Sequence, residues 1–269
     1  MASFDFDQAE GLRRMLQGPR PRIVTFLSAT PEDDKGAMLV NLGASLSQAG
    51  NDVLIVDACE REYGVARRLG LSRAASLLEV ARQECALNQV LHAVPQGFSV
   101  AALGAPQGSE DTRRLGKTFE VLVKQAGIVM VDAELGPDGE LPLPLMASSE
   151  IVVQVSTSAA SITNAYALIK HLSHQLGRRP FGILVTGATE AEAKVVYDNM
   201  STAATRYLAV TLNSMGSVPA DEYLHRAARL GRAVVDAFPL AGASVAFRQL
   251  AGKFALHAMG RGGSAHFGS

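Results

Sequence analysis

Residues 23–57 decide the fold of this chain, and their sequence is IVTFLSATPEDDKGAMLVNLGASLSQAGNDVLIVD. The stretch opens with one apolar run, Ile23–Ser28, and closes with a second one, Val53–Asp57. Between them a polar loop leads into Lys35–Ala49, where apolar residues recur at helical spacing. Runs that are apolar at nearly every position are typical of strands covered on both faces. The stretch therefore predicts two parallel strands joined by a right-handed helical crossover.

The same alternation of strand and helix continues along the chain. Further strands are expected at Phe98–Leu103, Ile128–Asp132, Ile151–Val155, Phe181–Thr186 and, more weakly, Val210–Asn213. Further helices are expected at Asp111–Gln125, Ser161–Gln175, Glu190–Arg206 and Ser244–Met259. The predicted fold class is α/β, with a mostly parallel, twisted sheet of about seven strands and helices on both of its faces.

Composition restricts the class of protein. The chain has 269 residues, of which 48% are hydrophobic and 19% charged, enough for one large domain with a full core. A formal net charge of −1 and an aromatic content of 6% without Trp argue against a nucleic-acid partner. The chain has only two cysteines and lacks a run of about 18 apolar residues that would span a membrane. A cytoplasmic protein is expected.

The two ends of the chain differ from its middle. Residues 1–20 form a short segment that a proline-rich stretch, Pro19–Pro21, joins to the first strand. Residues 261–269 are rich in Gly and Ser, and we expect this tail to be disordered. The α/β domain is expected to cover residues 21–260.

Three stretches carry a family signature. The first follows the pattern DQAxxLR, with Asp7, Gln8, Ala9, Leu12 and Arg13 at the matching positions. The second, Ser161–Leu172, has the sequence SITNAYALIKHL, and the third, Val234–Ala251, has the sequence VVDAFPLAGASVAFRQLA. In these stretches the chain resembles the MinD/ParA-type P-loop ATPases, in the flagellar-number regulator branch (FlhG, also called FleN). The resemblance spans nearly the whole chain and implies a MinD-like α/β fold.

The phosphate-binding loop of that family departs from its pattern here. The family has SGKGGVGKT after the first strand, whereas Ser28–Gly36 has the sequence SATPEDDKG. Asn41–Leu42 matches a family pair in the next helix and places Lys35 on the lysine that reaches the β- and γ-phosphates. The loop glycines that let backbone N–H groups converge on phosphate are missing. Pro31 removes a donor, and Gly36 replaces the hydroxyl that binds Mg²⁺.

Three carboxylates, Glu32, Asp33 and Asp34, occupy this loop. Each would repel a triphosphate by about 4 kcal/mol at about 4 Å and an effective dielectric of about 20. The same residues fit a helix start, with Thr30 as N-cap, Pro31 at the first position and acids in the first turn. The sequence thus predicts that the chain's own acids complement the helix N-terminus in place of phosphate.

A vestigial nucleotide site is expected at Lys35, Asp57 and Asp132. The two aspartates match family positions at the ends of strands, but Cys59 replaces the second aspartate of the family's DxD. Cys59 is expected to be an inert thiol. One interpretation makes Asp57 and Asp132 partners of Lys35 in a buried salt bridge. The alternative is an active ATPase with an unusual loop, which uses these three residues with ATP and Mg²⁺. We expect no catalytic residue, cofactor or metal under the first interpretation.

The resemblance also implies a partner. In the family the DQAxxLR element docks on the signal-recognition-type GTPase FlhF and promotes GTP hydrolysis. The resemblance implies the same role for residues 7–13. Flagellar switch proteins and a flagellar transcription regulator are alternative partners. Relatives in the MinD group use a C-terminal amphipathic helix at membranes, so a weak peripheral contact through Ser244–Met259 stays open.

Overall fold

The computed structural model describes residues 21–28, 30, 34–59, 64–71 and 74–260, with side chains up to residue 255. The predicted partner-binding segment, residues 1–20, and the predicted tail, residues 261–269, lie outside the described residues. The domain boundaries expected at both ends therefore stay predictions.

Eight strands of the described residues form one sheet. They are β1 (Arg22–Ser28), β2 (Val53–Ala58), β3 (His92–Ala93), β4 (Ser99–Ala102), β5 (Ile128–Ala133), β6 (Glu150–Val155), β7 (Phe181–Thr186) and β8 (Leu212–Val218). Their order is β3-β4-β2-β5-β1-β6-β7-β8, and all neighbours run parallel except β3 and β4. The α/β prediction is confirmed, with one more strand than expected, because the two-residue β3 gave no pattern in the sequence.

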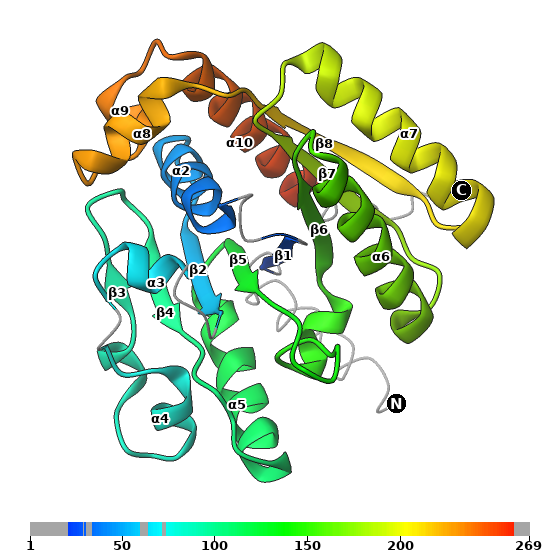
Figure 1. Ribbon diagram of the computed structural model, residues 1–269. Coiled ribbons are helices and arrows are strands. Elements are labelled where there is room, and N and C mark those ends of the chain that lie inside the picture. The colour runs from blue at the N-terminus through cyan, green and yellow to red at the C-terminus, as the bar shows by residue number, and fades with distance from the viewer. Residues whose placement is uncertain (1–20, 29, 31–33, 60–63, 72–73, 261–269) are drawn as a thin grey trace, which may run out of the picture.

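The five expected helices are present, and shorter ones lie between them (Figure 1). The α-helices are α2 (Lys35–Gln48), α3 (Val65–Arg68), α4 (Leu77–Ala81), α5 (Ser109–Leu122), α6 (Ala159–Leu176), α7 (Glu190–Leu208), α8 (Glu222–Arg229), α9 (Val234–Ala237) and α10 (Gly242–Gly260). Short 3₁₀ turns are η2 (Leu87–Gln89), η3 (Val123–Gln125) and η4 (Pro144–Ser148). Among the described residues, none of these helices has the length and apolar character needed to cross a membrane.

Helices cover both faces of the sheet and so create two cores. One core joins the sheet to α5, α6 and α7, and it contains Phe119 and Ile169. The other joins the opposite face to α2 and α10, and it contains Leu39 and Phe247. Strand β5 shows the alternation, because Val129 and Val131 belong to the first core and Ile128 and Met130 to the second. This burial on both faces explains why the strands are apolar at nearly every position.

The first strand and the helix that follows it contact the C-terminal region of the domain. In α2, Asn41 accepts a hydrogen bond through Oδ1 from the Val234 backbone N–H at 2.7 Å. At the start of β1, Arg22 forms an ion pair with Glu150 at 2.7 Å and donates to the Phe254 carbonyl. The first strand and its helix therefore anchor both ends of the region that includes α9 and α10.

Candidate functional site

The candidate site lies at the carboxyl ends of the central strands, where parallel α/β sheets place their ligands. Asp57 is the last but one residue of β2, and Asp132 is the last but one residue of β5. The two residues are direct partners in the register of the parallel pair. Lys35 is the first residue of α2, the helix that follows β1. The structure thus brings together the three residues that the sequence assigned to a vestigial nucleotide site.

The Lys35 ammonium contacts residues of β1 and β5. Its Nζ lies 2.6 Å from Asp132 Oδ1, and the lysine side chain is only 8% exposed. The same ammonium donates to the Ala133 carbonyl and, at 3.4 Å, to the Phe26 carbonyl. Burial is the largest single influence on the pKa of Lys35 and lowers it, but Asp132 together with Cys59 and Glu134 outweighs burial, so the pKa is raised. Acceptors within the chain therefore surround the ammonium. Its contact with Asp132 is the buried salt bridge that the sequence predicted for this aspartate.

Asp57 does not take part in that ion pair, contrary to the expectation that both aspartates would be partners of Lys35. Its Oδ1 accepts from the Cys59 backbone N–H at 3.0 Å, and its Oδ2 accepts from the Ala66 backbone N–H at 2.7 Å. Asp132 Oδ2 likewise accepts from the Val65 backbone N–H at 3.1 Å. Sequence reasoning missed these amides, because backbone donors leave no residue-specific signal in a sequence.

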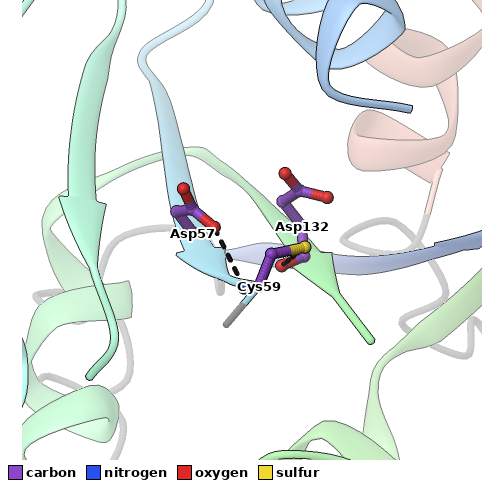
Figure 2. Close-up of side chains that lie close together, drawn as sticks. All are labelled: Asp57, Cys59 and Asp132. Atoms are coloured by element: carbon purple, nitrogen blue, oxygen red, sulfur yellow. Dashed lines mark hydrogen bonds between the residues drawn. The ribbon is translucent and has the colours of Figure 1, made fainter. Parts of the chain in front are cut away.

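Cys59 lies between the two aspartates (Figure 2). Its Sγ is 3.6 Å from Lys35 Nζ and 3.5 Å from the Asp132 carbonyl oxygen. One donor atom from each of Asp57, Cys59 and Asp132 lies within 4.8 Å of the others, a grouping that the sequence analysis did not expect. Burial raises the pKa of the Cys59 thiol, which disfavours the thiolate needed for nucleophilic attack or metal binding.

The start of α2 differs from the prediction. The N-cap is Asp34 and not Thr30, and its side chain accepts from the Ala37 backbone N–H at 3.2 Å. Asp34 has φ 44° and ψ 56°, a left-handed conformation that Asp tolerates better than most residues. The first turn of α2 contains no acid, so the predicted cap with acids inside the helix is wrong. A carboxylate of the chain nevertheless complements this helix N-terminus.

A cavity of about 320 Å³ lies beside these residues. The residues that line it include the charged Asp34, Lys35 and Glu134 and the apolar Leu135 and Leu168. The phosphate-binding position of a P-loop protein requires a lysine that can reach the ligand and converging backbone amides. Here the ammonium is bound to Asp132 and a carboxylate caps the helix. These described residues do not fit a magnesium–triphosphate group.

Asp57 should make stability depend on pH. Burial and the neighbouring Asp132 raise its pKa from 3.8 to about 6. Between these two values the folded chain binds a proton that the unfolded chain does not, so this stabilising contribution is lost as pH rises through about 6. Relative to Asp57→Asn, the wild-type free energy of unfolding should increase by about 1 to 3 kcal/mol from pH 7.5 to pH 5. Urea denaturation at both pH values measures this difference, and parallel curves for the two proteins would contradict it.

Comparison with solved structures identifies the fold. A MinD cell division protein of Aquifex aeolicus superposes with a TM-score of 0.67 and 17% identity, covering 92% of this chain and 100% of that one. A ParA family ATPase of Chlorobium tepidum gives a TM-score of 0.65 and 18% identity, covering 86% of this chain and 98% of that one. At these identities the likeness concerns the fold alone. The chain has the MinD/ParA-type P-loop fold.

A curated relative gives the family. The antiactivator FleN of Pseudomonas aeruginosa is 30% identical over 223 residues, which cover 80% of this chain and 79% of FleN. This chain belongs to the FleN family. An uncharacterized ATP-binding protein of Methanocaldococcus jannaschii is 21% identical over 225 residues, covering 81% of this chain and 82% of that protein. No protein-family model matches the chain.

Proposed function

We propose that this chain regulates flagellar number or placement through protein contacts, without binding or hydrolysing ATP. The observation that carries the proposal is the ion pair between Lys35 and Asp132. In this pair the lysine ammonium, which a nucleotide would need as a partner for its phosphates, is already bound to a carboxylate of the chain. Membership of the FleN family, which includes a protein named as an antiactivator, supports a regulatory role. Control would then come from the amount of the protein or from its partners.

The proposed partner is a signal-recognition-type GTPase of the FlhF kind, whose GTP hydrolysis this chain stimulates. The pattern DQAxxLR at residues 7–13 supports this partner, with Gln8 orienting water or Arg13 balancing phosphate charge. A flagellar transcription regulator is the second candidate partner, since an antiactivator acts on an activator.

The full chain should stimulate GTP hydrolysis by such a GTPase equally with and without ATP. Gln8→Ala should reduce the stimulation at least tenfold, because removing a residue that orients the attacking water costs that much or more. Gln175→Ala, an exposed glutamine on α6, is the matched control and should leave the stimulation unchanged. Steady-state GTPase assays measure the effect. Full stimulation by the Gln8 variant would place the activity elsewhere in the chain.

An active ATPase is the alternative function. The grouping of Lys35, Asp57 and Asp132 at the carboxyl ends of the strands favours it, because such enzymes hold Mg²⁺ and phosphate there. This alternative requires Lys35 to leave Asp132 when ATP binds. ATP-dependent stimulation of the GTPase, or ATP hydrolysis that Lys35→Ala abolishes, would favour the alternative over the proposal.

A further inference from the structure

Residues 64–71 form a short strap beside the candidate site, and three carboxylates bind it. The strap consists of Gly64, helix α3 and the turn that leads to Leu71, whose backbone N–H closes the helix on the Ala66 carbonyl at 2.8 Å. The three acceptors come from different elements, Asp34 before α2, Asp57 in β2 and Asp132 in β5. A single small segment is therefore attached to three parts of the fold.

Each carboxylate binds a different donor of the strap. Asp132 accepts from the Val65 N–H, and Asp57 accepts from the Ala66 N–H. Asp34 forms an ion pair with Arg68, whose Nη2 lies 2.5 Å from Asp34 Oδ1. Lys35 is ion-paired with Asp132 Oδ1, and the Cys59 N–H donates to Asp57 Oδ1. Every oxygen of the two buried carboxylates therefore faces a donor group of the chain. The strap supplies two of these four donors.

Gly64 allows the strap to approach this closely. A Cβ at this position would lie 2.5 Å from Asp57 Oδ2 and 2.6 Å from Oδ1, closer than real Cβ atoms come. The Asp57 carboxylate cannot move away without cost, because two amides hold it and the residue is only 7% exposed. Val65 and Ala66 are buried in the core that α2 and α10 share, which fixes the opposite side of the strap.

We infer that residues 64–71 act as a closing strap. Asp34, Asp57 and Asp132 hold the strap over the carboxylate corner, by which we mean the part of the vestigial nucleotide site that contains the Asp57 and Asp132 carboxylates. While the strap is closed, its amides occupy the carboxylate oxygens that a ligand of this corner would use. Opening requires the loss of all three contacts together, so the strap opens as one unit. The closure is independent of the regulatory role proposed above, because it is a property of the chain alone.

Hydrogen exchange measured by mass spectrometry on the full chain tests the strap. Gly64→Ala should accelerate exchange of peptides covering residues 64–71 at least tenfold, because the added Cβ displaces the strap from Asp57. Arg68→Ala removes only a partly exposed ion pair and should accelerate it about two- to fivefold. The matched controls are Gly116→Ala, whose added Cβ meets only an ordinary contact at 3.5 Å, and Arg113→Ala, which breaks an exposed ion pair on α5.

The two cysteines provide a second readout. Alkylation of Cys59 at the corner should accelerate in both strap variants, whereas Cys85, which follows α4, should react at its wild-type rate. If Gly64→Ala does not fold, Arg68→Ala still tests the inference through both readouts. Exchange in residues 64–71 that matches the controls would overturn the strap. Faster exchange with unchanged Cys59 alkylation would overturn the closure of the corner.

Discussion

Replacing Lys35 with alanine is expected to lower the free energy of unfolding by about 3 to 5 kcal/mol, because it leaves a buried charge without its partner. The lysine side chain is 8% exposed and that of Asp132 1%, so water can replace little of the lost ion pair. Urea denaturation at neutral pH measures the change. If Lys35 instead pointed into solvent to bind a ligand, its replacement would lower the free energy of unfolding much less. The measurement therefore also distinguishes a structural role of Lys35 from a ligand-binding role.

Two further variants separate the ion pair from general damage. Lys35→Met combined with Asp132→Leu removes both charges and should recover most of the lost stability, as replacements of buried ion pairs by apolar residues often do. Lys194→Ala breaks an exposed pair with Asp198 on α7 and should cost less than about 1 kcal/mol. If Lys35→Ala were as stable as Lys194→Ala, the structural role of Lys35 would be wrong.

Arg22→Ala is expected to cost about 2 to 4 kcal/mol, because one side chain makes three different contacts. Arg22 pairs with Glu150 on β6, donates to the Phe254 carbonyl of α10 and lies 4.8 Å from the centre of the Phe254 ring. Its removal leaves a buried carbonyl without this donor. Urea denaturation should show the loss, and hydrogen exchange should show it concentrated in α10.

A surface ion pair serves as the comparison for Arg22. Arg114→Ala breaks a pair with Glu110 between two half-exposed side chains and should change stability by less than about 0.5 kcal/mol. Equal stabilities for the Arg22 and Arg114 variants would show that β1 does not anchor the last helix.

The sequence predicted the sheet well where burial dictates the residue type. Strands β5 and β7 are buried on both faces, and their apolar runs placed them within a residue of their observed ends. Strand β8 lies at the sheet edge and includes Gly216 and exposed Asn213, so its apolar pattern is weak. It was expected at Val210–Asn213 but extends to Val218. An edge strand needs fewer apolar residues and therefore gives a fainter signal.

The site was predicted in part. Topology alone places Asp57 and Asp132 side by side, because the carboxyl ends of neighbouring parallel strands meet at one edge. Thr30 was predicted as the N-cap of α2, but Asp34 caps the helix. Both residue types are good N-caps, so residue type did not locate the start of the helix. The attachment of residues 64–71 depends on backbone amides and on a glycine that lacks a Cβ, features that become visible only in three dimensions.

Isothermal titration calorimetry of the full chain with ATP and Mg²⁺ tests the central claim, which is that Lys35 stabilises the fold and does not bind a nucleotide. The internal ion pair to Asp132 and the carboxylate cap of α2 predict no heat of binding up to millimolar nucleotide. A micromolar dissociation constant that depends on Mg²⁺ would contradict this account.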